Sequence, residues 1–204
     1  MGLKYSRSYI SIALHLAITV LIGFGIIILS LDKIECGIVL NLQSFAKKYL
    51  GIPFFKVLTY LGDFYLWTVF STVFFFYAYF ISRKNLSISL ELMVYIILVT
   101  ASTYLLKTTF SRPRPDCDDI IVYTPEAFFS YPSGHVSRAT GALLKLSKKS
   151  AFRTILIITA ISSLSLSRIV LGIHFPTDTL GAIFLSLAVY KITEIITHSF
   201  FKSP

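Results

Sequence analysis

The residues that could do chemistry in this chain fall into three short polar segments of an otherwise apolar sequence. They are residues 107–115, 132–135 and 167–178. The first supplies a lysine and arginines, the second a serine, a glycine and a histidine, and the third an arginine, a histidine and an aspartate. Such a set can hold a phosphate group and attack its phosphorus atom with an imidazole.

His174 and Asp178 are the pair with the clearest chemical meaning. A helix that begins near Pro176 would keep the carboxylate within reach of the imidazole ring. A carboxylate that holds one ring nitrogen fixes the tautomer and leaves the other nitrogen nucleophilic. Attack of such a histidine on phosphorus would give a phospho-histidine, and a second histidine could protonate the departing oxygen and then activate water.

Lys107, Arg114 and Arg168 supply fixed positive charge near the ends of apolar runs. A charge at membrane depth is costly unless it has a partner. For Lys107 alone, extension of the ammonium to the membrane surface is a sufficient explanation. Three cations around one dianion make better electrostatic sense than three unpaired cations, and the planar fork of arginine matches phosphate oxygens. We expect all three side chains to bind phosphate.

The segment 132–135 predicts a turn immediately before a helix. Amides at a helix start bind anions, and Gly134 lets the backbone approach a ligand closely. Two structural alternatives stay open, since Ser133 could serve only as a helix N-cap and His135 could be a hydrogen-bonded structural residue. Arg138, one turn later, either adds positive charge or anchors the helix at the interface.

A cluster of Asp116, Asp118 and Asp119 raises the question of a divalent metal. The spacing lacks the remaining ligands of a calcium loop, and the nearby Arg112 and Arg114 would repel a cation. The favoured interpretation is a solvated acidic rim. The sequence therefore predicts neither a metal nor another cofactor.

Apolar runs that suit membrane helices separate the polar segments. The chain has 204 residues, of which 55% are apolar and 14% charged, which is not the composition of an ordinary soluble domain. A bilayer core of about 30 Å needs about 20 apolar residues in a helix. The predicted spans cover residues 10–31, 62–82, 87–106, 134–147, 151–172 and 177–199.

The stretch 134–147 is the weakest of these candidates, and we expect a short helix packed inside the bundle. Residues 34–50 are predicted to form a helix that lies on the membrane surface. No domain boundary is visible, so a single domain over residues 1–204 is expected. The first span is longer than a signal-peptide core and lacks a cleavage motif, which predicts a retained helix.

The net charge of +9 could suggest nucleic acid, but its distribution favours a membrane. With the amino terminus in the cytoplasm and six spans, lysine and arginine are more frequent on the cytoplasmic side. Anionic lipid headgroups are then the simplest counterions, and no nucleic-acid partner is expected. Both termini would be cytoplasmic in the cell membrane, and all three polar segments would lie at the extracytoplasmic face.

The two cysteines, Cys36 and Cys117, would also lie at that outer face. A disulfide is possible, but two cysteines without a repeated framework do not define one. The favoured interpretation is a pair of small apolar thiols near the interface.

The three segments resemble the signature of the type-2 phosphatidic acid phosphatase superfamily, K-x6-R-P, P-S-G-H and S-R-x5-H-x3-D. The sequence matches this signature at every position. The resemblance implies an all-α, six-helix integral membrane phosphatase that needs no metal and forms a phospho-histidine. It also implies His174 as nucleophile, Asp178 as its partner and His135 as acid and base. The implied phosphate-binding residues are Lys107, Arg114, Ser133, Gly134 and Arg168.

This resemblance favours hydrolysis of a lipid phosphate or diphosphate whose tail enters between helices. By analogy, the expected substrate is a polyprenyl diphosphate of the undecaprenyl or dolichyl type, converted to the monophosphate for carrier-lipid recycling. Phosphatidate and phosphatidylglycerol phosphate are the alternatives. A transporter of anionic solutes would explain Arg168 at depth, but not the paired histidines. Haloperoxidase-like use of the pocket with vanadate is disfavoured by the membrane spans.

Overall fold

The computed structural model describes residues 2–147 and 150–201, and their regular secondary structure is entirely helical. Short 3₁₀ turns at Tyr60–Gly62 and Arg83–Asn85 flank α4. The α-helices are α1 (Gly2–Leu29), α2 (Asp32–Tyr49), α3 (Ile52–Thr59), α4 (Phe64–Phe80), α5 (Leu86–Phe110), α6 (Gly134–Leu146), α7 (Ala151–Val170) and α8 (Pro176–Phe201). The all-α class expected from the sequence is confirmed.

The expected number of six spans is not confirmed. Four segments of the described chain are long and apolar enough to cross a membrane, and they lie in α1, α5, α7 and α8. A fifth exists only if Ile52–Gly62 and Phe64–Phe80 form one broken span, with a bend of 41° between them. At 13 residues, α6 is shorter than the roughly 20 residues that a span requires.

The bend before α4 has a local cause in Asp63. This residue has extended backbone angles, and its Oδ1 accepts hydrogen bonds from the amides of Tyr65 (2.8 Å) and Leu66 (3.1 Å). A side chain that caps a helix start in this way begins a new helix instead of continuing the preceding one. The predicted span over 62–82 therefore begins in the 3₁₀ turn Tyr60–Gly62, and the chain changes direction at residue 63 before α4.

The short helix α6 lies inside the bundle, where it packs against α5, α7 and α8. Small residues allow this close approach. A side chain at Gly141 would overlap the ring of Tyr95 in α5, with its Cβ only 2.2 Å from that ring. The Tyr95 hydroxyl donates to the Ser137 carbonyl (2.5 Å) and accepts from the Gly141 amide (3.1 Å), so it fixes the position of α6.

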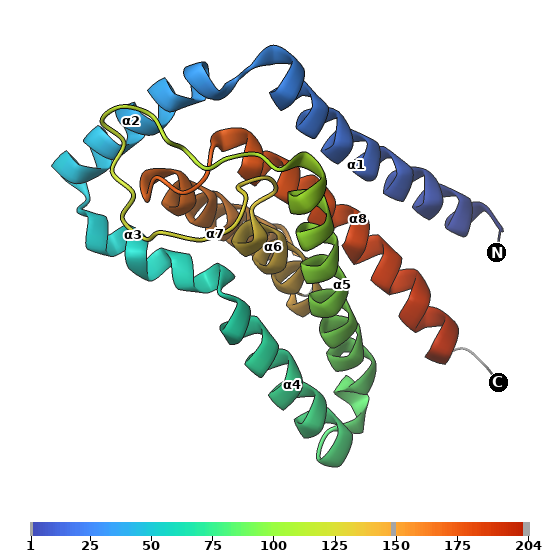
Figure 1. Cartoon of the computed structure of the whole chain (residues 1–204). Coiled ribbons are helices and arrows are strands. Elements are labelled where there is room, and N and C mark those ends of the chain that lie inside the picture. Colours follow the sequence, from blue (N-terminus) through green and yellow to red (C-terminus); the bar gives the residue numbers. More distant parts are fainter. Residues whose placement is uncertain (1, 148–149, 202–204) are drawn as a thin grey trace.

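The helix α2 lies across one end of the bundle, together with the loop of residues 111–133 (Figure 1). Its buried positions recur every fourth residue, at Glu35, Val39 and Gln43. The Gln43 amide nitrogen donates to the carbonyls of Ile121 (2.7 Å) and Val170 (3.0 Å). This side chain therefore joins α2, the loop and the end of α7.

Cys36 of α2 and Cys117 of the loop form a disulfide, so the interpretation as two separate thiols is wrong. The packing of α2 against the loop brings their Cα atoms to 6.2 Å across a sequence separation of 81 residues. That separation of Cα atoms suits a disulfide. Spacing along the sequence could not reveal it, because the contact depends on how the loop folds back.

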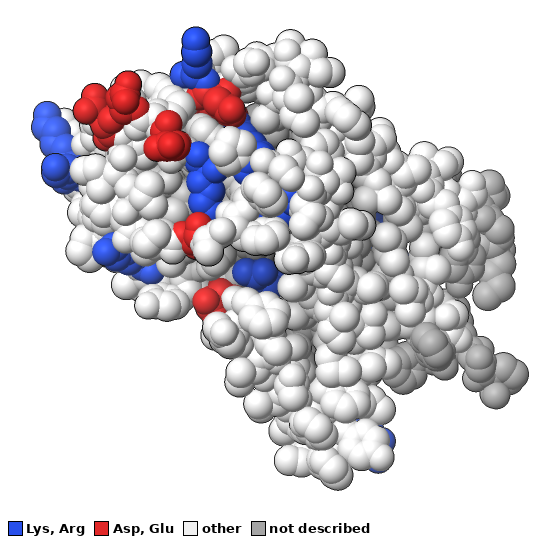
Figure 2. All heavy atoms as spheres, viewed as in Figure 1, with Lys and Arg blue, Asp and Glu red and all other residues white. Residues whose placement is uncertain are grey.

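The bundle has two distinct ends. The start of α1, the turn between α4 and α5, and the last turns of α8 lie at one end, whereas α2 and the 111–133 loop lie at the other (Figure 1). In Figure 2, lysine, arginine, aspartate and glutamate gather over α2 and the loop, and the adjoining sides of the bundle are almost uncharged. This distribution is that of a polar end above apolar, membrane-facing helix surfaces.

Candidate active site

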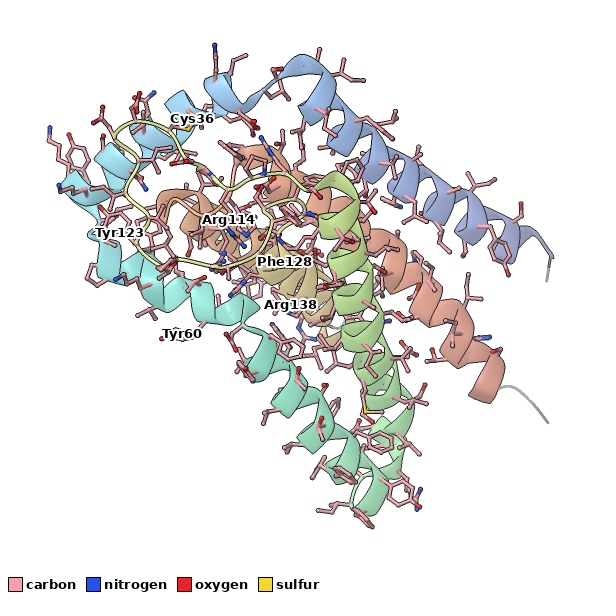
Figure 3. The ribbon with its side chains drawn as sticks, in the orientation of Figure 1. Cys36, Tyr60, Arg114, Tyr123, Phe128 and Arg138 are labelled. Atoms are coloured by element: carbon pink, nitrogen blue, oxygen red, sulfur yellow. A yellow bond between two sulfur atoms is a disulfide. The ribbon has the colours of Figure 1, made fainter. Side chains whose placement is uncertain are left out.

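The three polar segments meet beneath the 111–133 loop, at the end of the bundle that α2 covers. Lys107 lies in the last turn of α5, His135 at the start of α6 and Arg168 in the last turn of α7. Asp178 belongs to the first turn of α8, and Arg114 reaches in from the loop. In Figure 3 the labelled Arg114, Phe128 and Arg138 lie between α3 and α5.

His174 and Asp178 are in direct contact. The Nδ1 atom of His174 lies 3.2 Å from Oδ2 of Asp178, and both side chains are buried. The Phe175 amide donates to the same oxygen (2.9 Å), which holds the carboxylate in place. Burial lowers the pKa of His174 well below its usual value, and the charges of Lys107 and Arg168 add to this effect, which favours the neutral ring. If Nδ1–H faces the carboxylate, Nε2 keeps its lone pair.

Arg168 and Arg114 share a carboxylate that the sequence had not singled out, that of Glu126. Arg168 is 1% exposed, and its Nη2 pairs with Oε1 of Glu126. Arg114 Nη2 pairs with Oε2 of the same residue at 2.8 Å. Burial raises the pKa of Glu126, but the positive charges of Arg168 and Arg114 outweigh this effect and lower the pKa well below its usual range. The arrangement is an anion site occupied by a carboxylate.

His135 faces the same carboxylate, and Ser133 lies just before it. The Nδ1 atom of His135 is 3.9 Å from Oε1 of Glu126. Ser133 stands at the N-cap position of α6, yet its hydroxyl makes no capping hydrogen bond. This hydroxyl is buried and has no hydrogen-bond partner among the described residues. A buried donor in this condition is available to a ligand.

Lys107 points its ammonium toward the loop instead of toward Glu126. It donates to the carbonyl of Phe129 and to that of Ser130 (3.1 Å). Arg114 is held in a similar way, since Nε donates to the Phe128 carbonyl (2.6 Å) and Nη1 to the Ile173 carbonyl (2.7 Å). The loop backbone therefore positions both cations of the first motif.

Gly134 and Arg138 lie side by side at the start of α6. A Cβ atom at residue 134 would come within 3.1 Å of Nη1 of Arg138. The Arg138 side chain is buried, and its Nε donates to the Gly62 carbonyl (3.2 Å). Arg138 thus adds positive charge beside the expected phosphate-binding turn and also ties α6 to the turn before α4.

A cavity of about 390 Å³ borders the anion site. Its lining residues are Pro113, Arg114, Glu126, Ala127, Phe128 and Phe129. The charged groups thus face a space whose other walls include two aromatic rings. The acidic cluster of Asp116, Asp118 and Asp119 is exposed, as a solvated rim would be.

Two residues of this region were missed by sequence reasoning. Deeply placed cations need an anionic partner, and this requirement could have pointed to Glu126. Among the acidic residues of the loop, Glu126 is nearest in sequence to the second motif. In the sequence Arg112 stands out only as a charge that would repel a metal ion, but in the structure its side chain is 3% exposed. Burial opposes its charge, yet Asp178, Asp32 and Glu35 raise the pKa of Arg112 above its usual value.

Residues 88–201 match the family model of the PAP2 superfamily. The chain is also similar to decaprenylphosphoryl-5-phosphoribose phosphatase from Mycobacterium tuberculosis, with 32% identity over 98 residues, 47% of this chain and 54% of that protein. The enzyme of that name from Mycolicibacterium smegmatis is 34% identical over 83 residues, 40% and 44% of the two chains. This chain therefore spans about half the length of the curated relatives it matches.

Two solved structures share the fold. A PAP2-type phosphatidylglycerolphosphate phosphatase from Bacillus subtilis superposes with a TM-score of 0.71 over 95% of this chain and 99% of that one, at 21% identity. LpxE from Aquifex aeolicus gives a TM-score of 0.55 over 78% of this chain and 92% of that one, at 27% identity. The chain therefore shares its helical arrangement with these two proteins.

Proposed function

The chain belongs to the PAP2 superfamily, and from that premise we propose that it hydrolyses lipid phosphates or diphosphates through a phospho-histidine, without a metal. The carboxylate of Glu126 carries this proposal. It lies between Arg168 and Arg114 and faces His135, so it marks the place where the protein stabilises an anion. A substrate phosphate that displaces this carboxylate meets two guanidinium groups already in position.

In the proposed first step, Nε2 of His174 attacks phosphorus and the bond from phosphorus to the leaving oxygen breaks. His135 donates a proton to that oxygen, so the product leaves as an alcohol or a protonated phosphate. Asp178 stabilises the positive charge that develops on His174 during attack. Arg114, Arg168 and Lys107 stabilise the charge on the phosphoryl oxygens in the transition state.

In the second step, water attacks the phospho-histidine. His135, now neutral, accepts a proton from this water as the new bond to phosphorus forms and the bond to nitrogen breaks. Inorganic phosphate departs and His174 is regenerated. Ser133 fits the proposal as a further donor to the phosphate, because its buried hydroxyl has no other partner in the described structure. The amides at the start of α6, from Gly134 onward, supply additional donors.

For the substrate, we favour a polyprenyl diphosphate, converted to the monophosphate. The curated relatives support a polyprenyl-linked substrate, because their names specify a decaprenylphosphoryl group. Phosphatidylglycerol phosphate and phosphatidate remain the alternatives, and the name of the Bacillus subtilis protein supports the first of them. We place the active site at the extracytoplasmic face of the cell membrane, with both termini in the cytoplasm and the lipid tail entering from the bilayer.

The test is phosphate release by purified protein in detergent with a chelator present. Polyprenyl diphosphate, phosphatidate and phosphatidylglycerol phosphate are compared by turnover per enzyme. His174→Ala is expected to abolish release from every substrate, and His198→Ala, near the far end of α8, is the matched control. Full turnover by His174→Ala would remove the proposed nucleophile.

A further inference from the structure

We propose that Arg112 is a positioning residue of this reaction, which fixes the carboxylate of Asp178 so that one oxygen always faces His174. The inference rests on the proposed function, because it assigns a role in the attack by His174. Arg112 occupies one of the six variable positions of the first motif, so the signature assigns it no role. Its position follows directly from contacts in the structure.

The two oxygens of Asp178 have separate partners. Oδ1 accepts a hydrogen bond from Nη1 of Arg112 at 2.7 Å, whereas Oδ2 faces Nδ1 of His174 at 3.2 Å and accepts from the Phe175 amide. Rotation of the carboxylate would break both sets of contacts. Arg112 therefore determines which oxygen is available to the imidazole.

Arg112 is itself fixed by the first turn of α2. Its Nη2 donates to Glu35 and to Asp32, each at 2.6 Å, and Nη1 also donates to the Thr177 hydroxyl at 2.8 Å. Glu35 in turn accepts from the amide (2.8 Å) and the hydroxyl (2.9 Å) of Thr177, one residue before Asp178. The guanidinium thus joins α2 to the start of α8 in a planar, directional network.

The burial of Asp178 makes this contact energetically important. Asp178 is completely buried, and within residues 2–147 and 150–201 its ion-pair partners are Arg112 and His174. Of these two partners, Arg112 is the one whose charge is permanent, so it compensates the carboxylate whatever the protonation state of His174. Without it, a buried carboxylate would take up a proton or turn away, and the hydrogen bond that orients His174 would be lost.

Arg112 differs from the phosphate-binding cations in what it touches. Its nitrogen atoms contact Asp32, Glu35, Thr177 and Asp178, whereas Arg168 and Arg114 contact Glu126 in the anion site. A positioning role consequently predicts a change in kcat with little change in KM. Loss of a phosphate-binding arginine would raise KM as well.

Arg112→Ala tests the inference. We expect kcat to fall on the order of 10²–10³-fold while KM changes by less than about threefold. A cavity of about 140 Å³ borders Arg112 and Asp32, so added guanidinium can reach the vacated place. Guanidinium chloride at millimolar concentration should restore part of kcat, and sodium chloride of equal ionic strength should not. Arg83→Ala, at the opposite end of the bundle, is the matched control.

A double substitution separates positioning from general stability. If Arg112 acts through Asp178, Arg112→Ala should have almost no additional effect on kcat in an Asp178→Asn background. If Arg112→Ala does not fold, Arg112→Lys carries the test, with kcat expected about tenfold lower because one ammonium cannot replace the fork.

Unchanged kcat in either Arg112 variant, or a full additional loss in the Asp178→Asn background, would overturn the inference. These results differ from failure of the proposed function, which would appear as activity of His174→Ala. An inactive His174→Ala together with a fully active Arg112→Ala would leave the proposed function intact and reject the positioning role alone.

Discussion

Replacement of Glu126 by glutamine should strengthen phosphate binding. In the structure this carboxylate forms ion pairs with Arg168 and Arg114. An incoming phosphate dianion must therefore break both ion pairs or lie next to a like charge. Glutamine has nearly the same shape but no charge. The substitution therefore removes the competing anion and leaves the cations in place.

The expected gain can be estimated from Coulomb's law. Two like unit charges about 5 Å apart repel by about 2–3 kcal/mol at an effective dielectric constant of about 20–40. Glu126 is 32% exposed, so solvent screening reduces this to about 1–2 kcal/mol. At 1.4 kcal/mol for each factor of ten, phosphate should bind Glu126→Gln about 5- to 30-fold more tightly than wild type.

The assay is isothermal titration of the purified protein in detergent with inorganic phosphate. Glu91→Gln is the matched control, because Glu91 pairs with Lys145 in the described bundle and touches neither arginine. Its phosphate affinity should equal that of wild type. Equal or weaker binding by Glu126→Gln would show that the carboxylate does not occupy the phosphate site.

Two further predictions concern stability. In the folded protein the pKa of Glu126 is below its ordinary value of 4.5. Its ion pairs therefore stabilise the fold fully above about pH 4.5, and this stabilisation is lost as the pH falls through the folded-state pKa. In thermal unfolding without added anions, wild type should therefore be more stable than Glu126→Gln at pH 7, and the difference should shrink below pH 4.5; a constant difference would contradict the assignment. Removal of the disulfide by Cys36→Ser with Cys117→Ser should lower the free energy of unfolding by about 2–4 kcal/mol, because the bond closes a long segment of chain. Equal denaturation midpoints for this variant and wild type would argue against a stabilising disulfide.

The sequence predicted the residues of the candidate site through their spacing at helix ends. His174 and Asp178 are one helical turn apart, and Pro176 marks the start of α8 between them, so their contact follows from local geometry. The apolar runs likewise indicated helices, because hydrophobic composition and length report directly on membrane insertion. These features depend on neighbouring residues, and local reasoning was sufficient for them.

The features that sequence reasoning missed depend on how the 111–133 loop folds. Glu126 reaches Arg168 across 42 residues, and Arg112 reaches Asp178 across 66 residues. Nothing in the spacing indicates that the loop turns back over the site, where its carboxylate neutralises buried arginines. The disulfide and the network from Asp32 to Asp178 also require the position of α2. The bend at Asp63 was missed for a different reason, since one capping residue interrupts a run whose composition suggests a single helix.

The most direct test of the account is to trap the covalent intermediate. Purified protein is mixed with polyprenyl diphosphate, phosphatidate or phosphatidylglycerol phosphate, quenched during the first turnover under alkaline conditions, and analysed by peptide mass spectrometry. The account predicts a phosphoryl group on His174 that is stable to base and labile to acid, and that is absent from His174→Ala. First-turnover phosphate release with no modification of His174, or with a phosphoryl group on another residue, would contradict it.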